Sequence, residues 1–245
     1  MAKAQTDFGF AGGAPFSPHA PDEIAVCGKT FLADPSGALW WAQEQTLVVA
    51  DLHLEKGSAA ARAGSLLPPY DSRTTLLALA ALVARFGPSR VLALGDSFHD
   101  EAGVSRMGEE ELELLRGLQR GLEWLWITGN HDPEISPLAG GRVVPVATLS
   151  GLKFRHEPAA GSVSHEIAGH LHPAARLTRN GGSVRRKCFV ANGARLVLPA
   201  FGAYTGGLNV LNPAFRPLFG QGDFMVWMLG GATVYPVPRA RLGAD

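Results

Sequence analysis

The chain has 245 residues, of which 46% are hydrophobic and 18% are charged, so it is long enough to bury a full hydrophobic core. Lys plus Arg and Asp plus Glu number 22 each, which excludes an overall basic field that would attract nucleic acid. Cys27 and Cys188 lie far apart with no CxxC spacing, which excludes a disulfide framework or a zinc ribbon and favours a reducing, cytoplasmic compartment.

The N-terminal composition separates a leader from the rest of the chain. Residues 1–22 are rich in Gly, Ala and Pro without a period and are expected to form a loose leader, followed by a single domain over 23–245. No signal-peptide pattern and no run of about 20 apolar residues is present, so a membrane span is not expected.

The first half alternates predicted strands and helices. A hairpin over 31–41 reverses at residues 34–37, which are typical turn residues. Short apolar runs then predict buried strands at 46–50, 91–94 and 124–127. Helical spacing of apolar residues predicts helices at 74–86 and 109–118, the second with an acidic start. This order indicates a parallel sheet with functional residues at its carboxyl edge.

The second half consists mainly of short β-like runs. They lie at 143–144, 152–154, 184–190, 195–198 and 224–229, the last paired with 233–235. The expected fold class is therefore α/β, with two mixed β-sheets flanked by helices in a four-layer α/β/β/α sandwich.

Polar motifs follow the predicted strands and supply metal-ligand chemistry. They are Asp51-Leu52-His53, Gly95-Asp96, Gly129-Asn130-His131-Asp132 and Gly169-His170-Leu171-His172. Carboxylate oxygen, imidazole nitrogen and amide oxygen suit divalent cations, and two such ions about 4 Å apart can clamp the reacting oxygens of a phosphoryl transfer. Asp96 stands alone between the histidine motifs and is the natural bridging carboxylate.

In this order the motifs resemble the calcineurin-like metallophosphoesterase superfamily, over roughly residues 47–173. The resemblance implies two metal ions. The first would take Asp51, His53, Asp96 and His172, and the second Asp96, Asn130, His156 and His170. A metal-bridging hydroxide would be the nucleophile. The resemblance further implies that His131 is the general acid and that Asp132 orients its imidazole.

Some of these residues have other interpretations. Asp51 or Asp96 alone is as easily explained as a helix N-cap, although the full set of motifs argues against this. His165 lies near His156 and is the alternative ligand. His156 is preferred because it closes the apolar run 152–154, whereas His165 precedes its strand.

Further motifs resemble the bacterial DNA-ligase-associated metallophosphoesterases, over roughly residues 25–235. They are Asp51 to Ser58, Leu67 to Asp71, Leu198 to Gly202 and Tyr204 to Gly207. This likeness implies a manganese-dependent phosphodiesterase and DNA repair endonuclease, functionally associated with an ATP-dependent DNA ligase, a helicase and an exonuclease. Fe²⁺, Zn²⁺ and Ni²⁺ accept the same ligands. A homodimer is compatible with the sequence, but no residue pattern specifies one.

Substrate contacts are less well defined than metal ligands. Gly95 to His99 resembles the Gly-Asp-x-x-His element of double-strand-break repair nucleases, so His99 is a candidate to position the substrate backbone; an exposed loop histidine is the alternative, and Asp100 offers a supporting carboxylate. Arg185-Arg186-Lys187 is the one dense basic cluster, a phosphate-binding candidate or a solvated strand. Residues 204–207 are a flexible rim or a structural turn.

Three functions follow from these patterns. The first is a two-metal phosphodiesterase and endonuclease acting on single-stranded DNA and on RNA. The second is a hydrolase of small phosphoesters or cyclic nucleotides with the same metals. The third is a metal-free scaffold, which the complete set of polar residues disfavours.

Overall fold

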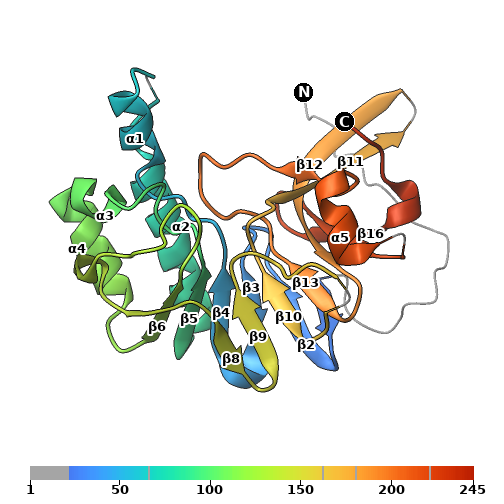
Figure 1. The fold of residues 1–245 in the computed structure, drawn as a ribbon, viewed down its shortest axis with the longest axis horizontal. Helices are drawn as coiled ribbons and strands as arrows, with labels where there is room; N and C mark the ends of the chain where they lie inside the picture. The colour runs from blue at the N-terminus through green and yellow to red at the C-terminus, as the bar shows by residue number, and fades with distance from the viewer. Residues whose placement is uncertain (1–21, 66, 162, 180, 221) are drawn as a thin grey trace, which may run out of the picture.

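The computed structural model describes residues 22–65, 67–161, 163–179, 181–220 and 222–245. Except for residue 22, the expected leader lies outside the described residues. The described chain folds into a seven-stranded and a nine-stranded sheet (Figure 1). The division into a leader and one domain remains a prediction.

The seven-stranded sheet changes from antiparallel to parallel along its width. Its strands are adjacent in chain order: β1 (Glu23–Val26), β2 (Lys29–Ala33), β3 (Leu39–Trp41), β4 (Thr46–Val49), β5 (Arg90–Leu94), β6 (Glu123–Ile127) and β7 (Arg142–Val144). The pairs from β1 to β4 are antiparallel, and those from β4 to β7 are parallel. The parallel strands were expected from their apolar runs, and their carboxyl ends meet at one edge of the sheet.

Helices cover the outer face of this sheet. Side chains of α2 (Asp71–Phe86), α3 (Gly103–Arg106), α4 (Glu109–Leu118) and the 3-10 turn η2 (Pro137–Ala139) pack there. Helix α1 (Lys56–Arg62) contacts α2 and α3, and the 3-10 turn η1 (Ala42–Glu44) lies between β3 and β4. Leu76 and Leu79 of α2 pack with Val49, Val91 and other buried residues of the sheet. Gly87 ends α2 with a left-handed φ of 55°, as the predicted stop requires. The α4 bounds are those expected from the sequence.

The nine-stranded sheet is built from the second half of the chain. Its strands are β8 (Ala147–Leu149), β9 (Leu152–Arg155), β10 (Glu166–Ala168), β11 (Pro173–Arg179), β12 (Gly182–Ala191), β13 (Arg195–Val197), β14 (Leu208–Asn209), β15 (Met225–Leu229) and β16 (Val234–Pro238). Strands β9, β10 and β13 are parallel neighbours, whereas β11, β12, β15 and β16 pair antiparallel. The sheet is mixed, as expected.

The two sheets enclose the main hydrophobic core. Trp41, Leu92 and Leu94 from the first sheet pack with Phe154 and Phe189 from the second. A separate cluster lies on the other face of the second sheet, under η3 (Pro213–Phe215) and α5 (Arg216–Phe219), and η4 (Arg239–Arg241) follows β16. Figure 1 shows α5 on the far side of the molecule from α2 and α4. The expected α/β/β/α order of layers is confirmed.

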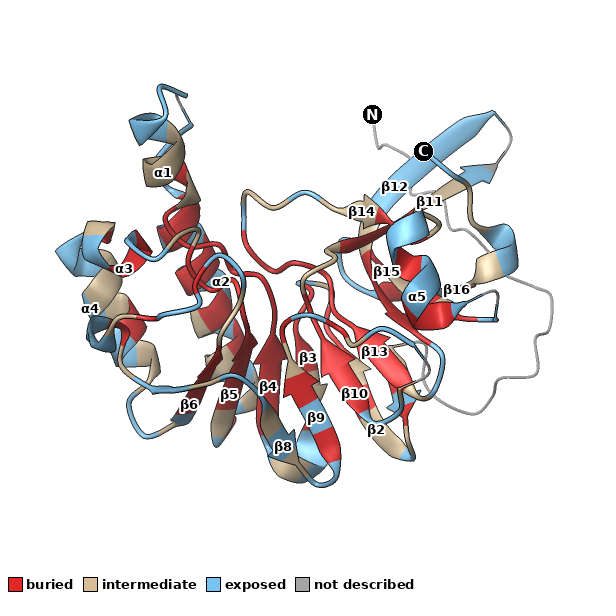
Figure 2. Cartoon of the chain, viewed as in Figure 1, coloured by how far each residue is buried: buried red, intermediate tan, exposed pale blue. Residues whose placement is uncertain are grey.

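Two features differ from the sequence-based expectations. Residues 143–144, expected in the second β-rich half, belong to β7 and form the edge of the first sheet, because they continue its parallel series. Helix α1 was not expected, since 56–62 has no apolar period. Figure 2 shows that the end of α1 and the first residues of β12 are exposed. Within the described residues, no helix has the length and apolar character needed to cross a bilayer.

Candidate metal centre

Five of the expected ligands have a left-handed backbone conformation. Their φ angles are 53° at Asp51, 43° at His53, 45° at Asp96, 71° at His170 and 45° at His172. Such angles are uncommon outside glycine and cost on the order of 1–3 kcal/mol each when strained. Their concentration at the strand ends indicates that the surrounding structure forces these side chains toward one place.

Main-chain hydrogen bonds join the first two ligand motifs. The amide of Asp51 donates to Gly95 O (3.2 Å), and the amide of His53 donates to Asp96 O (2.9 Å). The loops after β4 and β5 therefore continue side by side beyond the sheet. This continuation brings Asp51, His53 and Asp96 together at the carboxyl edge, where parallel sheets place functional groups.

The first group of potential ligands consists of Asp51, His53 and His172. Nε2 of His172 lies 3.3 Å from Oδ1 of Asp51 and 3.3 Å from Nε2 of His53. Burial lowers the pKa of His53 to about 3, which outweighs the opposite effect of Asp96, so this imidazole is in its neutral, metal-binding form.

The second group consists of Asp96, His156 and His170. Nε2 of His156 lies 3.3 Å from Oδ1 of Asp96, 3.0 Å from Nδ1 of His170 and 3.0 Å from Oδ1 of Asn130. Asp96 also places Oδ2 3.8 Å from Nε2 of His53, so its two oxygens face the two groups. This is the arrangement expected of a bridging carboxylate.

The chemistry of this second group fits a cation. Nδ1 of His156 donates to Leu94 O at 2.9 Å, so Nε2 is the nitrogen that faces the oxygens of Asp96 and Asn130. Burial lowers the pKa of His156, but the carboxylates of Asp96 and Asp51 more than offset it and raise the pKa to about 9. Positive charge is thus stabilised there. A divalent ion would supply that charge and accept the converging lone pairs.

The structure places the two alternative histidines differently. The His156 side chain is 5% exposed and lies within the second group. His165 is exposed, and its Nδ1 contacts the hydroxyl of its neighbour Ser164. Among the described residues it belongs to none of the potential metal-binding groups, so the geometry favours His156 as the ligand.

Asp132 holds the Asp96 loop rather than the His131 ring. Its carboxylate accepts hydrogen bonds from the amides of Asp96 (3.0 Å), Ser97 (2.7 Å), Phe98 (3.1 Å) and Gly129 (2.9 Å). The expectation that Asp132 orients the His131 imidazole was therefore wrong, because the carboxylate is buried among these main-chain donors. A Cβ at Gly129 would lie 2.2 Å from Oδ1 of Asp96, so glycine is required by this close approach.

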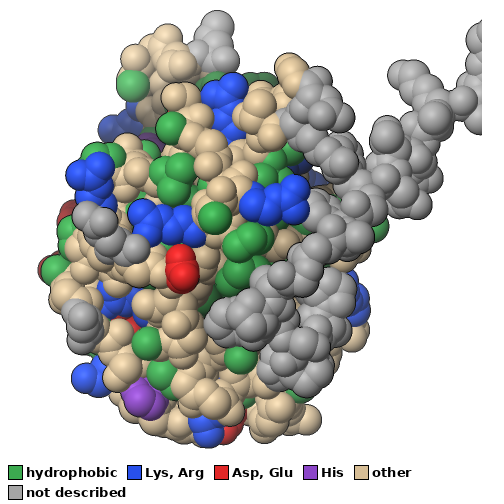
Figure 3. All heavy atoms as spheres, turned by 90° about the vertical axis from the view of Figure 1, so that its right-hand side faces the viewer, with side chains coloured by type: hydrophobic (Ala, Val, Ile, Leu, Met, Phe, Trp, Pro, Cys, Tyr) green, Lys and Arg blue, Asp and Glu red, His purple; other side chains and the backbone are tan. Residues whose placement is uncertain are grey.

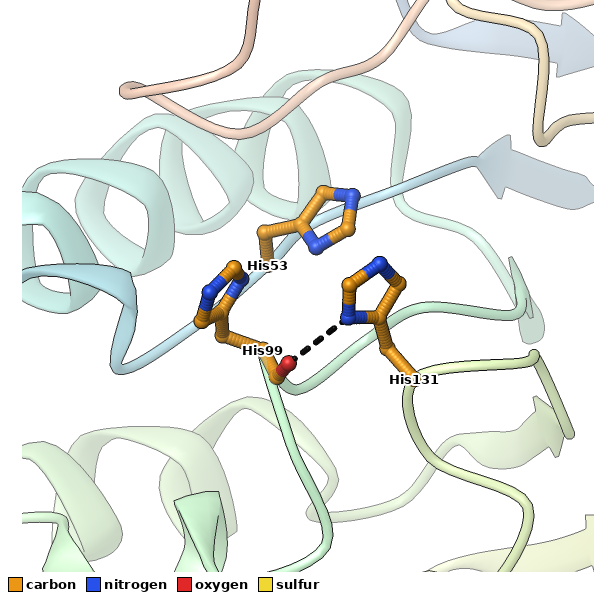
Figure 4. Close-up of side chains that lie close together, drawn as sticks. All are labelled: His53, His99 and His131. Carbon is orange, nitrogen blue, oxygen red and sulfur yellow. Dashed lines mark hydrogen bonds between the residues drawn. The ribbon is translucent and has the colours of Figure 1, made fainter. Parts of the chain in front are cut away.

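A main-chain carbonyl orients His131 instead. Nδ1 of His131 donates to His99 O at 2.9 Å (Figure 4). The His131 amide donates to Oδ1 of Asp96 at 2.9 Å. Because Nδ1 carries that proton, Nε2 is the nitrogen left to exchange a proton. His131 is exposed, so a substrate can reach it. No sequence signal identifies His99 O, since every residue has a carbonyl.

His99 lies directly beside this histidine. Its ring stacks on that of His131 with centroids 5.3 Å apart, and ligand atoms of His53, His99 and His131 lie within 4.8 Å of one another (Figure 4). Nδ1 of His99 and Nδ1 of His53 are buried without a hydrogen-bond partner. His99 is therefore not a remote loop residue. Asp100, the alternative, is engaged by Arg106 at 2.6 Å.

The expected basic cluster is divided between different environments. Lys187 is half-buried against 200–205, and Arg185 pairs with Asp245 at 3.0 Å. Arg186 is exposed, and its guanidinium donates to Arg185 O. Figure 3 shows Lys and Arg side chains spread over the upper part of one side face, separated by other side chains. The three residues do not form one continuous patch.

Comparison with known proteins supports the fold assignment. No family model and no curated protein matches the sequence. Among solved structures, the Pseudomonas putida nuclease MPE is 27% identical with a TM-score of 0.69, over 88% of this chain and 98% of that chain. Yfce, a phosphoesterase from E. coli, is 16% identical with a TM-score of 0.38, over 78% and 97% of the two chains.

The first of these similarities covers nearly the whole of both chains, and the expected ligand motifs converge in two buried His/Asp groups suited to metal ions. The chain therefore resembles the calcineurin-like metallophosphoesterases in fold as well as in sequence motifs, and it is a metal-dependent phosphoester hydrolase.

Proposed function

We propose that the chain is a two-metal phosphodiesterase that cuts single-stranded DNA internally, with RNA as a second substrate. The observation that carries this proposal is the position of Asp96, whose two carboxylate oxygens face separate ligand groups beside the exposed His131. The similarity to a nuclease over most of the chain supports a nucleic-acid substrate.

The ligand set would hold two divalent ions. Asp51, His53 and His172 would hold the first, and Asn130, His156 and His170 the second, with Asp96 shared. When bound, such ions withdraw charge from phosphate oxygens and lower the pKa of a bound water. Mn²⁺ is the ion implied by the resemblance to the DNA-ligase-associated proteins.

His131 supplies the proton for the leaving oxygen. Its Nδ1 proton is held by His99 O, so the second proton of the imidazolium resides on Nε2. As the oxygen of a hydroxide forms its bond to phosphorus and the P–O bond to the leaving oxygen breaks, Nε2 donates its proton to that leaving oxygen, and the ring returns to its neutral form. The hydrogen bond from Nδ1 to the carbonyl fixes the ring during this transfer. Asp132 contributes indirectly, by fixing the loop that carries Asp96 and His99.

The accessibility of this region favours a polymer over an enclosed small substrate. Asn130 and His131 are both exposed, although their neighbours Asp96 and Asp132 are buried. An extended strand can therefore approach the reacting groups without first being enclosed. His99, stacked on His131, is placed to contact the substrate backbone.

Cleavage of covalently closed single-stranded DNA circles tests the proposal. Because a circle has no end, its conversion to a linear strand requires endonuclease action. We expect linearisation with Mn²⁺ and none after chelation. The same assay is run on circular RNA, on the small diester bis-p-nitrophenyl phosphate and on the monoester p-nitrophenyl phosphate. Turnover of the monoester alone would overturn the nuclease proposal and favour a small-phosphoester hydrolase.

The biological setting is proposed from the sequence resemblance. It implies a DNA repair role with functional association to an ATP-dependent ligase, a helicase and an exonuclease. The ends that the enzyme leaves provide a direct test, since a ligase seals only a 5′-phosphate against a 3′-hydroxyl. Ends of the opposite kind would exclude direct hand-over to a ligase.

A further inference from the structure

Lys187 is a half-buried cation whose donors are directed at one loop. Its Nζ donates to Ala200 O (2.9 Å), Gly202 O (3.2 Å) and the Thr205 hydroxyl (2.6 Å). Within the described residues no carboxylate forms an ion pair with it. Burial lowers the pKa of Lys187 to about 8, with Asp51 acting in the opposite direction. The three N–H groups of the ammonium are thus already bound to Ala200 O, Gly202 O and the Thr205 hydroxyl in the absence of substrate.

The loop held by Lys187, residues 200–208, is named here the rim loop. At one end, Phe201 N donates to Ala50 O (2.8 Å) and Gly202 N donates to Asp51 O (3.2 Å). At the other end, Leu208 N donates to His172 O (2.8 Å). The rim loop thus connects the main chains of two first-group ligands, Asp51 and His172, which lie 121 positions apart in the sequence.

The rim loop has little room to move. A Cβ at Gly202 would lie 2.1 Å from Leu52 O, so the loop rests directly on the Asp51-Leu52-His53 motif. Ala203 N donates to the Thr75 hydroxyl (3.1 Å), and the Tyr204 hydroxyl donates to Pro68 O (3.0 Å). These bonds attach the rim loop to α2 and to the segment before it. Displacement of the loop would therefore disturb the main chain of the first ligand group.

The three oxygen atoms around Nζ explain why the cation is needed. Two carbonyls and a hydroxyl converge on Nζ. The Thr205 hydroxyl also donates to Gly202 O at 2.6 Å, whereas among the described residues Nζ is the one hydrogen-bond donor to Ala200 O. An ammonium satisfies all three at once. An uncharged side chain of the same length would leave the buried Ala200 O without a donor and would no longer join it to Gly202 and Thr205, so this end of the loop would open toward water.

We propose that Lys187 is a positioning residue: its ammonium locks the rim loop onto the main chains of Asp51 and His172 and so maintains the affinity of the first ligand group for its ion. This inference rests on the proposed function only in taking the first group as a metal site. It replaces the expectation that Lys187 contacts the substrate. Loss of a partner behind a metal ligand typically costs ~10–100-fold in affinity, and a similar loss is expected here.

Metal titration of the full chain tests the inference. Mn²⁺ binding is measured by calorimetry and by metal content after dialysis for the native chain, Lys187→Met and the exposed-lysine control Lys153→Met. We expect Lys187→Met to bind one of the two ions about 10–100-fold more weakly and the other as in the native chain. Saturating Mn²⁺ should restore kcat on single-stranded DNA without an increase in KM. Lys187→Arg, which keeps charged donors, should recover part of the affinity.

The opposite results would overturn the inference. Unchanged affinity for both ions, or a higher KM for DNA with both ions normally bound, would make Lys187 a neutral residue or a substrate contact. If circular dichroism shows that Lys187→Met does not fold, Thr205→Val is judged by the same titration; it removes one partner of the ammonium together with the bond from the Thr205 hydroxyl to Gly202 O. If the native chain binds two ions but cuts no DNA, the proposed nuclease function is refuted, and the inference about Lys187 still stands on the metal titration. If the native chain binds no ion, both the proposed function and the inference about Lys187 are refuted.

Discussion

The two ligand groups are built in different ways. In the second group, the His156 side chain is 5% exposed, and its Nδ1 is held by Leu94 O at the end of strand β5 in the other sheet. In the first group, the His172 side chain is 23% exposed, and the main chains of Asp51 and His172 are held by the rim loop. One group is supported by the sheet itself and the other by a segment that arrives from later in the chain.

This difference has consequences for metal binding. A site whose ligands are fixed by regular strands loses little freedom when an ion binds, whereas a site that depends on a loop must also order that loop. The second group should therefore bind its ion more tightly, and the first group should exchange its ion more readily. Substitutions in the two groups can separate these effects.

Replacement of Asp96 should have the largest effect, because this carboxylate faces both groups. Asp96→Ala removes the oxygens 3.3 Å from His156 Nε2 and 3.8 Å from His53 Nε2. We expect both ions to be lost and diester hydrolysis to fall by more than the ~100-fold upper range seen for residues behind a ligand. Metal content per chain checks this, with the exposed Asp223→Ala as the control. Retention of both ions would remove Asp96 as the shared ligand.

Substitution of a single histidine should remove the ion of one ligand group and leave the ion of the other group in place. His156→Ala is expected to lose the second ion and keep the first, and His172→Ala the reverse, each with about 100-fold or greater loss of activity. Electron paramagnetic resonance distinguishes a coupled Mn²⁺ pair from a single ion. The matched control is the exposed His165→Ala, which should keep both. If His165→Ala lost an ion and His156→Ala did not, the ligand assignment would have to be exchanged.

Removal of His131 should affect chemistry without affecting metal content, because its ring takes no part in the two ligand groups. His131→Ala is expected to slow cleavage of DNA by about 10²–10⁴-fold, the usual contribution of a general acid. Bis-p-nitrophenyl phosphate has a good leaving group that needs no proton, so its hydrolysis should fall much less. An equal loss on both substrates would indicate that His131 stabilises charge on the phosphate and does not donate a proton.

The parts of the molecule that sequence predicts are those with a local signal. The helix at Glu109–Leu118 was located to the residue because its apolar period and acidic start lie within ten positions. The strands β4, β5 and β6 were identified because strands buried on both faces are continuously apolar. Asp51, Asp96 and Asn130 follow these strands, so their convergence required only the rule that parallel strands end at the same edge. His156 and His170 follow β9 and β10 of the other sheet, and their place beside the first three depends on how the two sheets pack.

The parts that sequence missed depend on long-range contacts or on main-chain groups. Asp132 was expected to orient His131, but its carboxylate instead accepts hydrogen bonds from the buried main-chain amides of the loop at Asp96. The carbonyl that orients His131 has no residue-type signal. Lys187 belongs to a basic run in the sequence, yet its role depends on oxygens 13 to 18 positions away. Strand alternation turns Arg186 to the opposite face, whereas Arg185 shares the face of Lys187 and donates to Gly207 O.

The smallest expected effect concerns the basic residues next to Lys187. Arg185 already pairs with Asp245 and donates to Gly207 O, whereas Arg186, among the residues that the structure describes, donates to the carbonyl of its neighbour alone. If a DNA strand passes over β12, the guanidinium of Arg186 is the one available to a phosphate. Arg186→Ala should then reduce the slope of log K against log salt by about 0.7, the value for one single-stranded phosphate contact, and Arg185→Ala should leave it unchanged. Binding is measured without metal, so that cleavage does not interfere. Equal slopes for both variants and the native chain would confine the nucleic-acid contacts to the surroundings of the metal centre. A change in slope with Arg185→Ala alone would mean that DNA breaks the ion pair between Arg185 and Asp245 and binds Arg185 instead.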